Sequence, residues 1–283
     1  MKVVVYGLGH LGHVTAGCLH KLGVYAVGLY LPYPSEGEKP FFNEPNLPDM
    51  EVTLTNQEVV VGADFLWITF DTPVDDNGKA DIDWVFDRMN EVLPLIGPET
   101  AVIVSSQLPV GSVRNLEERY PLLTFYCLPE NLRHGTAVEN FLHPDRIVVG
   151  CRPVNKNRIF GLLDKIVPME KIQWMSTESA EMTKHAINAW MAMSICFANE
   201  IAALCRYVGS DPAEVERGMR TEERIGAKAY IRAGGPYEGR TLARDLEYLR
   251  RIQEEYGPVP LLMSIKQSND IHRDSPSRWE GKK

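Results

Sequence analysis

Glycines near the start of the chain have the spacing of a dinucleotide-binding turn. Residues 7–12 read GLGHLG, a G-x-G-x-x-G motif that directly follows an apolar run over residues 2–6. In such a turn the first glycine permits the tight bend, the second lets a pyrophosphate approach the backbone, and the third lets the helix pack on the strand. The helix that begins there offers unpaired N–H groups to phosphate oxygens. The predicted cofactor residues are Gly7, Gly9, His10, Leu11 and Gly12. The alternative is a strand-to-helix turn that binds nothing.

The two histidines at this turn are interpreted as helix-start residues near phosphate. His10 lies within the motif and His13 follows it. A metal site is not expected, because no third ligand is apparent in the sequence.

The next strand lacks the residue that usually binds the adenosine ribose. In NAD-binding folds that strand ends with Asp or Glu, whereas an Arg accommodates the 2′-phosphate of NADP. Here the corresponding place falls at Tyr30, within GLYLPYP. Tyr30 could stack on adenine or belong to the core, and the choice between NAD and NADP stays open.

The first half of the chain alternates strand and helix patterns. Apolar runs at 2–6, 24–30, 64–70 and 100–106 predict strands covered on both faces, as in a parallel sheet. Further strands are predicted at 123–127 and 146–150, with helical spacing over 80–96 and a proline-rich loop over 31–48. This order predicts an α/β fold of the Rossmann type, a doubly wound parallel sheet.

The second half is predicted to be mostly α-helical. Residues 176–209 contain no proline, and no glycine before their end, which predicts one helix of some 30 residues and about 45 Å. Ser176 is a plausible N-cap, and Glu178 and Glu181 suit the positive end of the helix dipole. Shorter helices are predicted at 212–220, 241–255 and 260–272. We therefore expect an NAD(P)-binding domain over 1–175 and a helical substrate and dimerisation domain over 176–283.

Composition excludes several classes of function. The 283 residues carry a net charge of −8 with no basic block before the last few residues, which disfavours nucleic-acid binding. No apolar run reaches about 18 residues, so no membrane-spanning helix is expected, and the N-terminal run is too short for a signal peptide. The five cysteines show no paired spacing, which favours reduced thiols in a cytoplasmic protein.

Several segments together resemble the UDP-glucose/GDP-mannose dehydrogenase family, in the expected order from residue 1 to about 272. The most specific of these segments is LPENLRHGTAVENFLHPDRIVVG, which resembles the family's N-P-E-F-L-R-E-G…P-x-R-I-V-x-G pattern. The matching segments read GLGHLGHVTAGCL, FFNEPNLPDM, TFDTPVDDNGKADIDWV, SSQLPVGS, LPENLRHGTAVENFLHPDRIVVG, ESAEMTKHAINAWMAMSICFANEIAALC and RIGAKAYIRAGGPYEGRTLARD. Members of this family oxidise a sugar C6 alcohol twice with two NAD, through a cysteine-bound thiohemiacetal.

The resemblance implies four catalytic residues. Glu130 matches a glutamate that positions the catalytic water, Lys184 and Asn188 match a lysine and an asparagine at the reaction centre, and Asp245 matches a general base at the start of a helix. Lys184 and Asn188 lie four residues apart and so share a helix face, from which both could donate to a carbinol oxygen. The alternatives are a solvated Lys184 and an Asp245 that merely favours a first helical turn.

The resemblance also implies residues that bind the cofactor and the substrate. The predicted cofactor-binding residues also include Thr72, Pro73, Ser106 and Gln107, which lie in the two turns that follow later strands. The substrate set comprises Arg133, His134, Arg224, Lys228, Tyr237 and Thr241. His134 could be an additional proton donor or a surface histidine.

The chain departs from the family pattern at residues that matter chemically. The family cysteine falls at Thr241, its nearby lysine at Arg244, and the second glutamate of P-E-F-L-R-E at His134. The sequence also stops where the family continues into a third, nucleotide-binding domain. A hemithioacetal is what lets an aldehyde lose a second hydride, and a threonine hydroxyl is a far weaker nucleophile than a thiolate.

The favoured hypothesis is therefore an NAD(P)-dependent two-electron oxidoreductase that interconverts an alcohol with an aldehyde or ketone, on a small polar or nucleotide-linked substrate. It could act as a reductase. The alternatives are a non-catalytic dinucleotide-binding descendant, a complete UDP-sugar 6-dehydrogenase, and a decarboxylating 3-hydroxyacid dehydrogenase. A homodimer through helix 176–208 is also expected, with Trp190, Met191, Met193 and Tyr207 as candidates for the interface.

Overall fold

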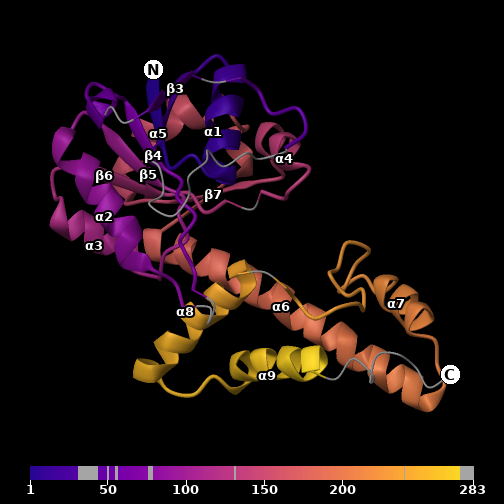
Figure 1. Ribbon diagram of the computed structural model, residues 1–283. Coiled ribbons are helices and arrows are strands. Elements are labelled where there is room, and N and C mark those ends of the chain that lie inside the picture. The colour runs from indigo at the N-terminus through magenta and orange to yellow at the C-terminus, as the bar shows by residue number, and fades with distance from the viewer. Residues whose placement is uncertain are drawn as a thin grey trace. The chain divides into compact units, whose positions relative to one another are not determined.

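The computed structural model describes residues 1–30, 44–49, 51–54, 57–75, 79–130, 132–238 and 240–274 (Figure 1). The chain forms two compact units, and each is described by itself. The first unit comprises Met1–Pro73 and Ala80–Lys184, and the second comprises Val74–Lys79 and His185–Lys283. The division into domains at residue 175 stays a prediction.

The first unit is built on an eight-stranded sheet in the order β3-β2-β1-β4-β5-β6-β7-β8. Every neighbouring pair is parallel except β6 and β7, which meet antiparallel at Cys127 and Gly150. The strands are β1 (Lys2–Tyr6), β2 (Tyr25–Tyr30), β3 (Glu51–Leu54), β4 (Phe65–Ile68), β5 (Ala101–Val104), β6 (Thr124–Cys127), β7 (Ile147–Gly150) and β8 (Ile172–Met175).

Both faces of this sheet are covered, as the continuous apolar runs predict. Along β1, Val3 and Val5 belong to one buried cluster, and Val4 and Tyr6 to the other. The first cluster includes side chains of α1 (His10–Lys21), α4 (Ala137–Leu142) and α5 (Lys156–Leu163). The second includes side chains of α2 (Ile82–Val92) and α3 (Ser112–Arg119). The predicted Rossmann-type, doubly wound fold is therefore confirmed.

The sequence patterns missed the short elements of the first unit. Strands β3 and β8 and helices α3, α4 and α5 were not predicted, and none of them exceeds eight residues. Short elements carry too few periodic positions to stand out from loop sequence. Residues 31–43 of the predicted proline-rich loop lie outside the described residues.

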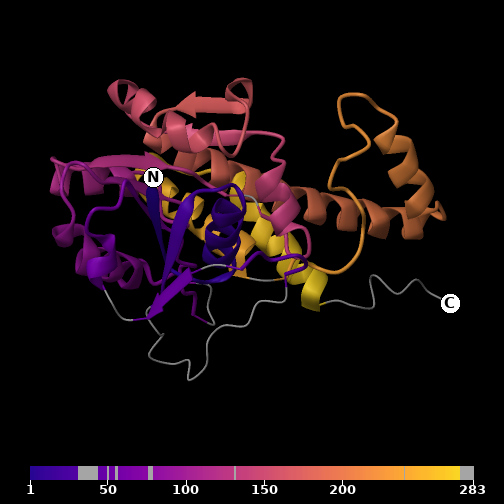
Figure 2. The ribbon, with the colours of Figure 1, turned by 90° about the horizontal axis from the view of Figure 1, so that it is seen from above.

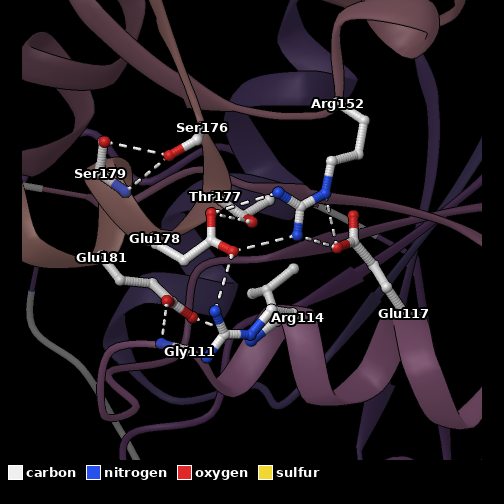
Figure 3. A network of polar contacts seen from close by, with 10 residues as sticks. Gly111, Arg114, Glu117, Arg152, Ser176, Thr177, Glu178, Ser179 and Glu181 are labelled. Carbon is white, nitrogen blue, oxygen red and sulfur yellow. Dashed lines mark hydrogen bonds and ion pairs between the residues drawn. The ribbon is translucent and has the colours of Figure 1, made fainter.

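A polar network holds the N-terminal end of α6 (Thr177–Val208) within the first unit (Figure 3). The Arg152 guanidinium donates to both Glu117 and Glu178, and the Arg114 guanidinium lies 3.8 Å from the Glu178 carboxylate. Although burial opposes ionisation, the hydrogen bonds from Arg152 lower the pKa of Glu178 to about 2. The predicted cap is confirmed, because the Ser176 hydroxyl accepts the backbone N–H of Ser179 at 3.1 Å.

Glu181 has a different role from the one predicted for it. Its carboxylate accepts the backbone N–H of Gly111 at 2.6 Å and that of Val113 at 2.9 Å. Glu181 is 6% exposed, so these two N–H donors take the place of most of the water that would otherwise solvate its carboxylate. Glu181 therefore caps the N-terminus of α3, whereas the sequence assigned its charge to the dipole of its own helix.

The second unit consists of the rest of α6 with α7 (Pro212–Arg220), α8 (Arg240–Tyr256) and α9 (Pro260–Asp274). These bounds agree with the helices predicted from the sequence. Its core is formed by small and apolar side chains, namely Ala189, Ala192, Cys196, Tyr237, Leu246, Leu249 and Ile265. Figures 1 and 2 show α7 beside the C-terminal part of α6, where Ile201 and Val215 line a shared small pocket.

Helix α6 is long and apolar enough, by length and composition alone, to cross a membrane, and 44% of its most apolar window is buried. The sequence had suggested no such segment. Its Ala189, Ala192 and Cys196 pack into the core of the second unit, which accounts for part of this apolar character. Every cysteine of the chain is free and buried, which agrees with the expected reduced thiols.

Candidate dinucleotide and reaction sites

The glycine motif forms a turn that larger residues would disrupt. Gly7 has a φ of +105°, and a Cβ there would lie 2.8 Å from the backbone nitrogen of Phe70. A Cβ at Gly12 would lie 2.1 Å from the carbonyl oxygen of Gly7. At Gly9 a Cβ would meet the Asp71 carboxylate at 2.7 Å, which is the mobile end of a side chain. Backbone conformation and helix packing therefore require Gly7 and Gly12 whether or not a ligand binds.

The N-terminus of α1 suits an anionic ligand. No side chain caps it, and its first turn contains no acidic residue. The first N–H groups of a helix have no intrahelical acceptor, so a pyrophosphate there would find both donors and the positive end of the dipole. In addition, the Ser106 hydroxyl oxygen is buried without a hydrogen-bond partner among the described residues, and so it is available to a bound group. These features fit a dinucleotide.

The other predicted cofactor residues follow neighbouring strands at the same edge of the sheet. The glycine turn follows β1, Thr72 and Pro73 follow β4, and Ser106 and Gln107 follow β5. The hydroxyl of Thr72 donates to the carbonyl of Gln107, which ties two of these turns together. Dinucleotides bind at the carboxyl ends of parallel strands, and these turns lie there.

Tyr30 belongs to the core of the first unit. It is 8% exposed and packs in the buried cluster on the α1 side of the sheet. Of the two roles left open by the sequence, packing is the one that this burial favours, and an adenine contact stays a prediction.

In the second unit a buried carboxylate links α6 to α8. The amide of Asn188 donates to Asp245 Oδ2 at 2.5 Å, and the guanidinium of Arg244 donates to Oδ1 at 3.1 Å. The imidazole Nδ1 of His185 lies 3.6 Å from Oδ2, beyond hydrogen-bond range but close enough for strong attraction if protonated. Asp245 is 0% exposed and its partners are at most 5% exposed, so this cluster lies inside the protein.

The environment of Asp245 keeps it ionised. Burial opposes ionisation, but the neighbouring His185, Arg244 and Asn188 hold the pKa of this carboxyl below its usual value. The expectation that Asp245 stands in the first turn of its helix was wrong, because α8 begins at Arg240 and has no acidic residue in its first turn. The negative charge of Asp245 is therefore stabilised by the side chains that contact it, and not by a position in the first turn of α8.

The catalytic pair predicted on α6 lies in a buried stretch of that helix. Lys184 is 9% exposed and Asn188 is 4% exposed, which excludes a solvated surface lysine. Sequence reasoning missed His185, which is 1% exposed and whose ring meets that of Tyr248 edge-on at 5.3 Å. Its position three residues before Asn188, and therefore on the same face of the helix, was the available signal.

Three buried polar side chains fix the loop before α8. Asn199 on α6 accepts the N–H of Gly234 and donates to the carbonyl of Gly235, at 2.9 and 3.1 Å. Asn269 on α9 likewise pairs with both backbone groups of Tyr237, at 2.8 and 3.2 Å. His272 Nε2 lies 2.9 Å from the carbonyl oxygen of Gly234. No sequence pattern indicated these anchors, which lie 32 to 38 residues from the loop residues that they contact.

The predicted substrate residues differ in exposure. Tyr237 is 7% exposed and packs in the core of the second unit, where burial raises the pKa of its hydroxyl to about 12. The remaining substrate candidates are exposed, namely Arg133, His134, Arg224, Lys228 and Thr241. Among them, Arg224 is ion-paired with Glu222 at 2.8 Å. Glu130 is half-buried in the first unit. That these residues and Glu130 serve one substrate stays a prediction.

The Asp245 cluster predicts a pH-dependent contribution to stability. A carboxyl whose folded pKa is lowered stabilises the protein above its unfolded pKa of about 3.9 and loses that contribution as the pH falls through the folded value. The free-energy advantage of the wild type over Asp245→Asn should therefore be full at pH 7 and shrink below about pH 4. Urea unfolding of both proteins between pH 7 and pH 3 measures it. Asp164→Asn, at an exposed aspartate, is the control, and an advantage that stays constant with pH would contradict the assignment.

Comparisons with known proteins agree with this fold. Residues 44–165 match the model of the UDP-glucose/GDP-mannose dehydrogenase family, NAD binding domain, and residues 178–271 match that family's central domain. A nicotinamide dinucleotide, NAD, is therefore the cofactor of the matched domain.

Two individual relatives are both named UDP-glucose 6-dehydrogenase. UDP-glucose 6-dehydrogenase of Rickettsia conorii is 33% identical over 69% of this chain, and that of Pseudomonas aeruginosa is 29% identical over 100% of it. The chain spans 46% of the first relative's length and 70% of the second's. The structure of a UDP-glucose dehydrogenase from Pyrobaculum islandicum matches with a TM-score of 0.80 at 27% identity, covering 98% of this chain and 69% of that one. The chain belongs to the UDP-glucose/GDP-mannose dehydrogenase family.

Proposed function

We propose that this chain is an NAD(P)-dependent two-electron oxidoreductase that interconverts an alcohol with an aldehyde or ketone on a nucleotide-linked or small polar substrate. One arrangement of buried side chains carries the proposal. The Asn188 amide on α6 donates to the buried Asp245, and Lys184, four residues before Asn188 on the same helix, is buried as well. Unpaired buried charges are costly, so a chain that had lost its chemistry would have little reason to keep this arrangement.

The side chains suggest a division of labour. A bound nicotinamide supplies the hydride acceptor or donor. Lys184 and Asn188 would donate hydrogen bonds to the carbinol oxygen and stabilise the charge that develops on it. Asn188 already donates one of its amide hydrogens to Asp245, which fixes the orientation of its amide plane. Glu130 and His134 are retained as candidates for moving protons in the same reaction.

Asp245 suits a positioning role better than that of a general base. A base works best when its pKa lies near the working pH, whereas the neighbours of Asp245 lower its pKa. An ionised Asp245 would hold Asn188 in place by accepting its amide hydrogen. This modifies the role that the family resemblance implies for it.

Thr241 limits the proposed reaction to a single hydride transfer. It lies exposed in the first turn of α8, at the position that matches the family cysteine. A second oxidation would require a covalent adduct that the threonine hydroxyl forms poorly at neutral pH. We therefore propose that the product of oxidation leaves as the aldehyde or ketone.

Loss of the Lys184 ammonium should abolish most of the activity. With NADH or NADPH and a panel of aldehydes, ketones and nucleotide-sugar aldehydes, the wild type should oxidise the cofactor, as followed by its absorbance. Lys184→Ala should lower kcat about 10²–10³-fold, the usual effect of removing one donor to a developing oxyanion. Lys165→Ala, at an exposed lysine of the first unit, should match the wild type. If the wild type binds NADH tightly but turns over no member of the panel, the non-catalytic alternative is favoured and the proposal fails.

We also propose that α6 forms the interface of a homodimer. Several large apolar side chains of this helix are exposed, among them Trp190 at 65% and Tyr207 at 89%. Met191 is half-buried, whereas Met193 packs against the core of the second unit and is less suited to an interface. Exposed apolar surface of this kind commonly marks an interface.

Light scattering at micromolar concentration should therefore give twice the chain mass of 31.9 kDa. Trp190→Glu should shift the protein towards the monomer, because it places a charge in an apolar contact. Leu122→Glu, at an exposed apolar residue of the first unit, should leave the dimer intact. A wild-type monomer under these conditions would contradict the proposal.

A further inference from the structure

The structure brings two histidines and a glutamate together within the first unit, at a place where the sequence showed no third ligand. His10 begins α1, Glu44 precedes a short turn, and His134 lies in the turn before α4. One ligand atom from each of the three lies within 4.8 Å of the others. The imidazole Nε2 of His10 is 2.9 Å from Glu44 Oε2, and the rings of His10 and His134 have centroids 4.1 Å apart.

We propose that His10, Glu44 and His134 form a binding site for a divalent first-row transition metal such as Zn²⁺. Two imidazoles and one carboxylate are a common ligand set for such ions, with further positions left to water or another ligand. The proposal does not depend on the dehydrogenase reaction.

The carboxylate of the site is held as a metal ligand requires. Glu44 is 6% exposed, and its two oxygens accept the backbone N–H groups of Gly135 at 2.9 Å and Ala137 at 2.7 Å. These donors orient the carboxylate from behind, as outer hydrogen bonds do in known metal sites. Oε1 keeps a further lone pair beside the Ala137 N–H, whereas at Oε2 an ion would take the place of the present contact with His10 Nε2. The hydrogen bond between Glu44 and His10 occupies the position that a metal would bridge.

The geometry requires only a small closure around the ion. In the tetrahedral geometry of Zn²⁺, ligand atoms at about 2.0–2.2 Å from the ion lie about 3.3–3.6 Å apart, so ligand atoms that are now separated by up to 4.8 Å would move closer by at most about 1.5 Å. His134 is exposed, so its ring can turn towards the other two ligands, and an ion can enter from its side. His10 is partly shielded, with 12% of its side chain exposed, and Glu44 is shielded further, at 1%.

The ion would connect three segments that are distant in sequence. Glu44 is 34 residues from His10 and 91 residues from Gly135, to which it is already bonded. A bound metal would therefore fasten the start of α1, which carries the glycine motif, to the turn that carries Arg133 and His134. It would place a positive charge beside the N-terminus of α1, in reach of an anion bound there.

Metal binding is tested on the full-length chain without a histidine tag. The protein is treated with a chelator, and Zn²⁺ binding is measured by calorimetry and by elemental analysis after gel filtration. Binding of Co²⁺ is followed by its visible absorption, which reports ligand type and geometry independently of activity. We expect one ion per chain. His134→Ala removes an exposed ligand with little risk to folding and should weaken binding at least tenfold.

The control replaces another exposed histidine of the same unit. His20→Ala lies at the C-terminal end of α1 and should bind metal as the wild type does. His10→Ala should weaken binding as His134→Ala does, with thermal unfolding used to verify that the variant folds. The proposal is overturned if the wild type retains no metal at equimolar micromolar concentrations, or if His134→Ala binds it as tightly as the wild type.

Discussion

A carboxylate that leaves water must find donors inside the protein, and this constraint ties together segments that are distant in the sequence. The three buried acidic residues among those described are Glu44, Glu181 and Asp245. Each is compensated by N–H groups from a segment far away in sequence: the turn before α4, the start of α3, and the Asn188 amide on α6. Because an unpaired buried charge costs several kcal/mol, each acid fixes the segment that supplies its donors. The turn before α4, the start of α3 and Asn188 on α6 are held in this way.

The elements that the sequence predicted well are those with strong local signals. The buried runs of the sheet and the 32-residue α6 carry long, unbroken patterns, and their predicted bounds lie within a few residues of the observed ones. The individual roles of acidic residues were harder to predict, because they depend on contacts across long separations. Glu181 was expected to favour the dipole of its own helix, and its hydrogen bonds to the start of α3 were not predicted. The expectation that Asp245 lies in a first helical turn was wrong. Asn269 and His272, which hold the loop before α8, gave no local signal at all.

Membership of the family and departure from its pattern together narrow the chemistry. The matches to the family's NAD binding domain and central domain cover residues 44–165 and 178–271, and the second range contains Lys184 and Asn188, the residues proposed to donate to the substrate oxygen. In the reaction that we propose, Thr241 in place of a cysteine removes the nucleophile of a second oxidation and leaves the groups assigned to a single hydride transfer. In this proposal the cluster around Asp245 would preorganise Asn188, whose amide it already holds by a hydrogen bond. Preorganised donors contribute to catalysis because they need not reorient during the reaction.

The most direct test of this account is the number of NADH molecules formed per substrate oxidised. With the alcohol form of whichever substrate is turned over, NAD in excess, and the products quantified by mass spectrometry, the wild type should form one NADH per substrate and release an aldehyde or ketone. Thr241→Cys restores the missing thiol and should move the stoichiometry towards two, with a carboxylate as product. A wild-type stoichiometry of two would contradict the central claim, because the chain would then complete the second oxidation without a cysteine at this position.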